Sequence, residues 1–128
     1  MSTTNVVLIV DDDSSTQKAV VRLLGLRGFD TEAFDSGEQL LAWADLHAAV
    51  CVVLDIHLPG LSGIQVRQRL AAADASLPVI FMTGNDSDAT RRCALEAGCV
   101  AYLCKPFSSQ TLATAVDKAV SLRRHTAA

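Results

Sequence analysis

The stretch "CVVLDIHLPG" (Cys51–Gly60) runs from four apolar residues directly into an aspartate, and a Pro-Gly pair follows. A short apolar run that is rich in valine favours a β-strand covered on both faces. A carboxylate at the end of such a strand costs free energy to bury unless its charge is paired or bound to a cation. Asp55 is therefore expected to have a partner that offsets this cost.

Other segments of the chain repeat this pattern. The strongly apolar runs are Asn5–Val10, Val50–Leu54, Pro78–Met82 and Val100–Leu103. A fifth segment, Phe29–Phe34, alternates more and carries two acids, which predicts an edge strand. Near-continuous apolar runs of this length are typical of a parallel sheet that is buried on both faces.

Helical patterns fill the gaps between these runs. We expect helices over Ser14–Arg27 with Gly28 as its stop, from Ser36 through Trp43, from Ser62, from Asp86 or Ser87, and from Ser108. The order is then strand and helix five times over. Such alternation predicts an α/β fold, a doubly wound parallel sheet with helices on both faces.

Composition limits the classes of function. The chain has 128 residues, and we expect one domain over residues 5–124 with no second domain. A formal net charge of −3 argues against a nucleic-acid surface or a polybasic membrane surface. The four cysteines form no CxxC or His/Cys cluster, which argues against zinc. No secretory leader and no apolar run of ~20 residues is evident, so the cytoplasm is the expected location.

Polar groups stand where the apolar strands end. The first strand is followed by Asp11, Asp12 and Asp13, and the later ones by Asp55, Thr83 and Lys105. Ligands of open α/β sheets bind beyond the carboxyl ends of the strands. If the first, third, fourth and fifth strands are neighbours, these groups share one rim.

Such a rim has a defined chemistry. Carboxylates held close together repel, so one pKa rises or a cation binds. A set of hard oxygen ligands suits Mg²⁺, or Mn²⁺ in its place. A lysine and a hydroxyl beside the metal stabilise charge on a transferring phosphoryl group. A carboxylate can also be the nucleophile and form an aspartyl-phosphate.

Four motifs carry a resemblance to a known family. They are "LIVDDD" (Leu8–Asp13), "VVLDIHLPGLSG" (Val52–Gly63), "PVIFMTG" (Pro78–Gly84) and "AGCVAYLCKPF" (Ala97–Phe107). In this order they resemble the receiver domains of bacterial two-component response regulators, over about residues 5–122. The resemblance implies a flavodoxin-like (βα)5 fold with strand order 2-1-3-4-5.

The resemblance also implies roles for single residues. Asp55 would be the phosphoacceptor. Asp12 would contact Mg²⁺ directly and Asp11 mostly through water, and the backbone carbonyl of His57 would be a further ligand. Lys105 would pair with the phosphoryl oxygens, and its peptide bond to Pro106 would be cis.

A second set of implied roles concerns switching. Thr83 would move to bond the phosphoryl group, and Tyr102 would swing inward with it. His57 and Asn85 would modulate the lifetime of the phosphoryl group. The face made by the fourth helix, the Val100–Leu103 strand and the last helix would then change. The fourth helix is the least apolar, so it should be the easiest to shift.

The implied function is a signalling switch rather than an enzyme for a separate substrate, although the chain would catalyse its own phosphorylation and dephosphorylation. The phosphoryl donor would be a sensor histidine kinase or a phosphotransfer protein. The switched face would dock a downstream protein or a second receiver, with no direct nucleic-acid or membrane partner. "SGEQLLAWA" (Ser36–Ala44) and "LPVIFMTGNDS" (Leu77–Ser87) resemble receivers of nitrogen-fixation-type transcriptional regulators. The sequence names neither the kinase nor the target, and the chain is expected to be either a stand-alone receiver or a part of a larger regulator or hybrid kinase.

Three alternatives remain open at this point. A haloacid-dehalogenase-like phosphatase needs a second aspartate two residues after the nucleophile, where this chain has His57. A flavodoxin-like cofactor binder needs a phosphate loop after the first strand, where "DDDSST" (Asp11–Thr16) would repel phosphate. A receiver-like scaffold that is never phosphorylated would not need the complete set of acids, hydroxyl and lysine.

Overall fold

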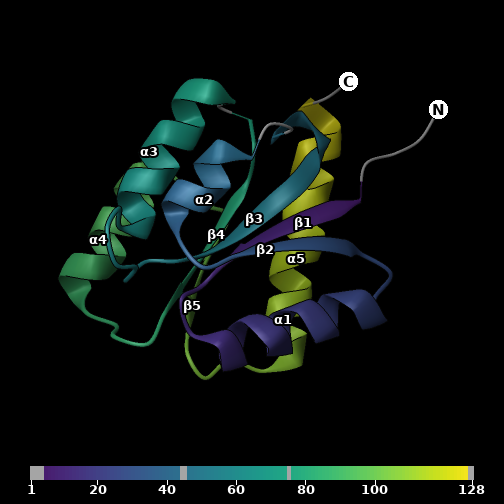
Figure 1. Ribbon diagram of the computed structural model, residues 1–128, viewed down its shortest axis with the longest axis horizontal. Coiled ribbons are helices and arrows are strands. Elements are labelled where there is room, and N and C mark those ends of the chain that lie inside the picture. The colour runs from purple at the N-terminus through teal and green to yellow at the C-terminus, as the bar shows by residue number, and fades with distance from the viewer. Residues whose placement is uncertain (1–4, 44–45, 75, 127–128) are drawn as a thin grey trace.

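The computed structural model describes residues 5–43, 46–74 and 76–126. Five parallel strands form one sheet in the order β2-β1-β3-β4-β5 (Figure 1). The strands are β1 (Val6–Val10), β2 (Asp30–Phe34), β3 (Ala49–Asp55), β4 (Val79–Thr83) and β5 (Ala101–Cys104). The helices are α1 (Ser14–Leu26), α2 (Gly37–Ala42), α3 (Gly63–Ala73), α4 (Asp88–Ala97) and α5 (Ser109–Thr126), with a 3-10 turn η1 at Leu46–Ala48. The expected flavodoxin-like fold and strand order are confirmed.

Alternation along the strands divides the core between the two faces of the sheet. In β1, Val7 and Ile9 pack in the cluster that includes side chains of α1 and α5. Leu8 and Val10 pack in the other cluster, with side chains of α2, α3 and α4. Figure 1 shows α1 and α5 on one side of the sheet and the other helices opposite. β3 is buried along its whole length, as its apolar run predicts.

The bounds of all five strands and of α1 differ by one residue, at one end or at both, from the sequence-based expectation, and Thr83, expected after the fourth strand, is the last residue of β4. Asp55 is the last residue of β3, paired in register with Met82 of β4, rather than the residue after the strand. The second helix ends at Ala42, so the prediction that it includes Trp43 is wrong. Trp43 adopts extended backbone, and its ring packs edge-on against Phe34 at a centroid distance of 6.3 Å. Ala44 lies outside the described residues.

Side-chain caps fix where the helices begin. Asp13 is the N-cap of α1, and Ser62 forms a capping box with Gln65 at α3. Ser87, not Asp86, caps α4 by accepting a hydrogen bond from the Thr90 amide. The loops that lead to α1 and α4, residues 11–13 and 84–87, are short, whereas the loop before α3 spans residues 56–62.

A buried ion pair closes the opposite, amino-terminal edge of the sheet. Arg123 of α5 donates to both carboxylate oxygens of Asp74, at 3.2 and 2.8 Å. It also donates to the carbonyl oxygen of Ala49, the first residue of β3, and to the Ser76 hydroxyl. The hydrogen bond from Arg123 holds the pKa of Asp74 at about 2, well below its ordinary value of 3.8.

This pair generates the first prediction. Replacing Arg123 with methionine should lower the free energy of unfolding at pH 7 by about 2–4 kcal/mol, because buried Asp74 loses its arginine counter-charge and, among the described residues, keeps only its contacts with exposed His47 and with Ser76. A lowered carboxyl pKa stabilises the fold above the unfolded value and loses that stabilisation as pH falls towards the folded value. Wild type should therefore lose stability between about pH 4 and pH 2, and the variant should lose less over that interval.

Urea unfolding at a series of pH values measures both effects. Arg124→Met is the matched control, since Arg124 is exposed on the same helix, and it should stay within about 0.5 kcal/mol of wild type. Equal losses in the two variants would contradict the buried-pair account.

Candidate functional site

Neighbouring strands bring the polar strand-end residues to one edge of the sheet. Asp11 follows β1, Asp55 ends β3, Thr83 ends β4 and Lys105 follows β5. Since β1, β3, β4 and β5 are adjacent in that order, their carboxyl ends meet. The predicted site residues therefore lie at one edge of the sheet, and their chemical roles stay predictions.

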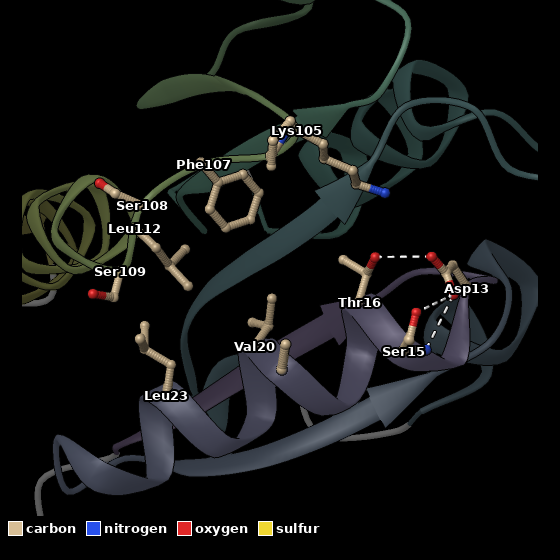
Figure 2. Close-up of a pocket in the computed structure, with 12 residues that line it drawn as sticks. Asp13, Ser15, Thr16, Val20, Leu23, Lys105, Phe107, Ser108, Ser109 and Leu112 are labelled. Carbon is tan, nitrogen blue, oxygen red and sulfur yellow. Dashed lines mark hydrogen bonds between the residues drawn. The ribbon is translucent and has the colours of Figure 1, made fainter.

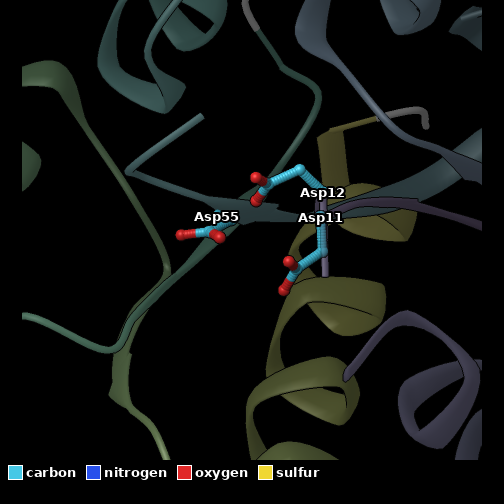
Figure 3. Close-up of side chains that lie close together, drawn as sticks. All are labelled: Asp11, Asp12 and Asp55. Carbon is cyan, nitrogen blue, oxygen red and sulfur yellow. The ribbon is translucent and has the colours of Figure 1, made fainter. Parts of the chain in front are cut away.

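Three carboxylates form the centre of this edge. Figure 3 shows Asp11, Asp12 and Asp55 side by side at the ends of β1 and β3. One oxygen from each lies within 4.8 Å of the other two. Asp11 is fully buried and Asp55 is 5% exposed, whereas Asp12 faces solvent. Two like charges are therefore held together out of water, and the third closes the cluster from the solvent side.

Lys105 bridges the two buried carboxylates. Its Nζ lies 2.8 Å from Oδ2 of Asp11 and 3.3 Å from Oδ2 of Asp55. Burial raises the pKa of Asp55, and the charge of Asp11 adds to this, while the Lys105 ammonium opposes both. Burial alone would lower the pKa of Lys105, but the hydrogen bond to Asp11 and the charge of Asp55 raise it. The lysine is accordingly held charged between the two acids.

Backbone amides complete the hydrogen bonding of the buried acids. The amide of Asp13 donates to Oδ1 of Asp11 at 2.8 Å, and the amide of His57 donates to Oδ1 of Asp55 at 3.1 Å. The His57 side chain is exposed, as expected for a rim position. Gly63, at the start of α3, packs so closely on the Asp55 carbonyl that a Cβ would collide with it. Any larger residue there would displace the end of β3.

Gln17 is a contributor that sequence reasoning missed. Its Nε2 lies 3.0 Å from the carbonyl oxygens of both Asp11 and Phe34, and 3.1 Å from Oδ1 of Asp35. The amide side chain thereby ties the loop after β1 to the loop after β2, and it fixes the backbone that carries Asp11. A lone glutamine on a helix gives no sequence signal for this contact, because both partners lie on other segments.

Thr83 and Tyr102, for which the resemblance implied a switching role, both form hydrogen bonds with the loop before α4. Thr83 is fully buried, and its Oγ1 accepts a hydrogen bond from the amide of exposed Asn85 at 3.0 Å. Tyr102 is partly exposed, and its hydroxyl donates to Oδ1 of Asp86 at 2.8 Å. The cis peptide bond between Lys105 and Pro106, which the resemblance implied, is present.

The donor set fits a hard divalent cation. Three carboxylates and one ammonium leave a formal charge of −2, the complement of a divalent ion. Asp12 has no salt bridge among the described residues, and one of its oxygens is close to Asp11 and Asp55. Few protein oxygens and an open solvent side match Mg²⁺, which keeps several of its waters.

A groove of about 610 Å³ lies beside the lysine, between α1 and the start of α5. Figure 2 shows Val20 and Leu23 on α1 facing Phe107 and Leu112 across it, with Asp13 and Thr16 nearer its polar end. The groove therefore joins an apolar floor to the charged edge of the sheet.

These features, an acid cluster, a bridging lysine and a hydroxyl at successive strand ends of a 2-1-3-4-5 sheet, coincide with a known family. The family profile described as response regulator receiver domain matches residues 7–117. The chain belongs to the response regulator receiver family. Receiver domains act in two-component signalling, where they interact with sensor kinases and downstream effectors, and the family generally binds Mg²⁺ at an acidic pocket.

The receiver is similar to parts of longer regulators. Nodulation protein W of Bradyrhizobium diazoefficiens is 35% identical over 123 residues, which are 96% of this chain and 54% of that protein. Transcriptional regulatory protein FixJ of the same organism is 30% identical over 94% of this chain and 58% of its own length. The solved structure of response regulator StyR matches with a TM-score of 0.87 at 32% identity, covering 94% of this chain and 61% of that one. The chain thus spans little more than half the length of these relatives.

No helix among residues 5–43, 46–74 and 76–126 has the length and apolar character needed to cross a membrane.

The bridging lysine generates the second prediction. Replacing Lys105 with methionine should lower the free energy of unfolding without Mg²⁺ by about 2–4 kcal/mol, because two buried carboxylates lose their shared counter-charge. Added Mg²⁺ should restore part of this loss, since a cation can take over that role. Urea unfolding with and without Mg²⁺ measures both. Lys18→Met, on an exposed position of α1, is the control, and equal stability of the two variants would contradict the account.

Proposed function

We propose that this receiver accepts a phosphoryl group on Asp55, from the phosphohistidine of a sensor histidine kinase or a phosphotransfer protein. The observation that carries the proposal is the position of Lys105, whose Nζ lies 2.8 Å from Asp11 and 3.3 Å from Asp55. A nucleophilic carboxylate beside a fixed ammonium and a second acid is suited to phosphoryl transfer, which depends mainly on positioning and on charge stabilisation.

The chemistry assigned to each residue follows from its surroundings. A carboxylate oxygen of Asp55 forms a bond to phosphorus while the P–N bond of phosphohistidine breaks, which leaves an aspartyl phosphate and a free imidazole. Lys105 is within reach of the incoming phosphoryl oxygens because it already contacts Asp55. Asp11, Asp12, Asp55 and the His57 carbonyl would hold Mg²⁺ or Mn²⁺, which neutralises charge on the phosphoryl group. Water later cleaves the acyl phosphate and returns Asp55 and inorganic phosphate.

The groove between α1 and the start of α5 is the docking place that we propose for the phosphoryl donor. Its apolar lining, with Val20, Leu23 and Phe107, suits the apolar stripe of a partner helix. Lys105 and Asp13 line its polar end, so a histidine on that helix would lie near Asp55.

The output that we propose runs from Thr83 and Tyr102 to the face made by α4, β5 and α5. α4 has a single buried residue, Ala94, and Leu95 on the same helix is 62% exposed. A helix with so few buried contacts shifts at low cost. The occupant of this face would be a downstream protein or a second receiver, and the cytoplasm is the location that we propose.

The alternatives have less support. A dehalogenase-like phosphatase lacks its second aspartate, because the His57 side chain stands there and is exposed. A flavin-type phosphate loop after β1 is replaced by three acids. A scaffold that is never phosphorylated gives no reason for Lys105 to bridge two buried acids.

The third prediction tests the phosphoacceptor. Acetyl phosphate with Mg²⁺ should add one phosphoryl group to the protein, seen as a single mass increment by intact-mass spectrometry. Asp55→Asn should remove the increment, and omission of Mg²⁺ should slow its appearance sharply. Asp30→Asn, an exposed acid on β2, is the control and should be phosphorylated like wild type. Phosphorylation of Asp55→Asn at the wild-type rate would overturn the proposal.

The fourth prediction concerns lifetime. His57 and Asn85 are exposed at the rim beside Asp55 and Thr83, so they border the path of the attacking water. His57→Ala and Asn85→Ala should each change the autodephosphorylation rate severalfold, in a direction that depends on whether the side chain blocks or orients water. Decay of the phosphorylated mass with time measures the rate. Wild-type decay in both variants, with unchanged thermal unfolding, would remove any role for these positions.

A further inference from the structure

Outside the acidic cluster, the side chains of Asp86, Arg91 and Tyr102 form a closed triangle of contacts. Asp86, in the loop between β4 and α4, accepts the hydrogen bond from the Tyr102 hydroxyl at 2.8 Å. Arg91, in α4, pairs with the other oxygen of Asp86 at 2.7 Å. The Arg91 guanidinium carbon also lies 5.5 Å from the centroid of the Tyr102 ring, within the range of a cation–π contact. Each of the three residues thus contacts the other two, from three different segments.

The triangle is coupled to Thr83 through a short loop. Asp86 is only three residues after Thr83, whose Oγ1 accepts the amide of Asn85. Movement of Thr83 towards Asp55 would break that hydrogen bond and release the loop that carries Asp86. Because Asp86 holds both Tyr102 and Arg91, a shift of this loop strains all three contacts together.

The electrostatics agree with a closed triangle at neutral pH. Burial, and then the hydrogen bond to Asp86, raise the pKa of Tyr102 to about 12. The hydrogen bond from Tyr102 is in turn the main reason why the pKa of Asp86 is lowered. A protonated phenol donating to an ionised carboxylate is a charge-assisted hydrogen bond, which is stronger than one between neutral groups.

We propose that Asp86 and Arg91 form a latch that holds Tyr102 in its resting orientation and that opens when the receiver is activated. This inference rests on the proposed phosphoryl switch. The Asp86 and Arg91 side chains are 37% and 49% exposed, so water competes for each contact and the latch is weak enough to open. Its role is to set the ratio of resting to active conformations, not to hold the fold together. Asp86 and Arg91 are positioning residues in this scheme, because they act through Tyr102.

The first experiment measures the cost of activation. Beryllofluoride with Mg²⁺ imitates the phosphoryl group. If it binds the active conformation, its apparent affinity is the intrinsic affinity multiplied by the fraction of protein that is already active. Asp86→Asn and Arg91→Gln should bind it about three- to tenfold more tightly than wild type, because less of the latch has to be broken. Asp88→Asn and Arg92→Gln change the same charges on nearby exposed positions of α4 and should bind like wild type.

Tyr102 is the only tyrosine of the chain, which gives a direct readout. In protein labelled with 3-fluorotyrosine, the single fluorine signal of Asp86→Asn should shift, before any beryllofluoride is added, towards the position of activated wild type. In a Tyr102→Phe background, Asp86→Asn should change beryllofluoride affinity by less than about twofold, since the latch has already lost its hydroxyl. A full effect in that background, an unchanged affinity of Asp86→Asn, or an equal effect of the controls would overturn the latch.

A last measurement separates the latch from the proposed function. Ultraviolet titration of unlabelled wild type should show Tyr102 ionising near pH 12, and Asp86→Asn should lower this midpoint part of the way to the ordinary value of 10. Asp88→Asn should not change it. If wild type bound no beryllofluoride while this shift was present, the phosphoryl proposal would fail and the latch contact would stand. If the midpoint did not shift, the latch itself would be overturned.

Discussion

The constraint on which the rest of the structure depends is the juxtaposition of two like charges at the ends of β1 and β3. The parallel pairing of these strands puts Asp11 and Asp55 at the same edge, and both are nearly excluded from water. Such an arrangement is stable only with a counter-charge, which Lys105 brings from the end of β5. One lysine balances one of the two buried acids, so this edge of the sheet keeps a net negative charge.

The sequence predicted the fold and the members of the acid cluster because both depend on local signals. A short apolar run indicates a buried strand, and four such runs and one alternating edge segment, separated by helical patterns, predict a parallel α/β sheet, whose strand order the family resemblance supplied. The acids at strand ends become a cluster once strands are parallel, since all carboxyl ends then share one edge. The boundary errors were small. Asp55 completes β3 because its backbone pairs with β4, and Trp43 leaves the second helix to pack on Phe34.

Contacts between distant segments were not predictable in the same way. Gln17, Arg91 and Arg123 are ordinary surface-type residues in the sequence, and nothing near them in the chain identifies their partners. Each becomes informative only when the fold places an acceptor opposite it: two carbonyls and Asp35 for Gln17, Asp86 and a tyrosine ring for Arg91, Asp74 and β3 for Arg123. The resemblance to the receiver family implied no role for Gln17, Arg91 or Arg123, because their contacts depend on which side chains this chain carries at the partner positions.

The two edges of the sheet differ in how firmly side-chain contacts hold the neighbouring helices. At the amino-terminal edge, Arg123 joins α5 to β3 and to Asp74 through a nearly dry ion pair, which leaves α5 little freedom at that end. At the carboxyl edge, the α4 loop depends on partly exposed contacts among Asp86, Arg91 and Tyr102. Arg67 of α3 bonds the carbonyl of Gly98 and anchors the far end of α4. Under the proposed phosphoryl switch, a change of charge at Asp55 would meet the least resistance at the start of α4, and α4 would pivot about its anchored end while the sheet and the base of α5 stayed in place.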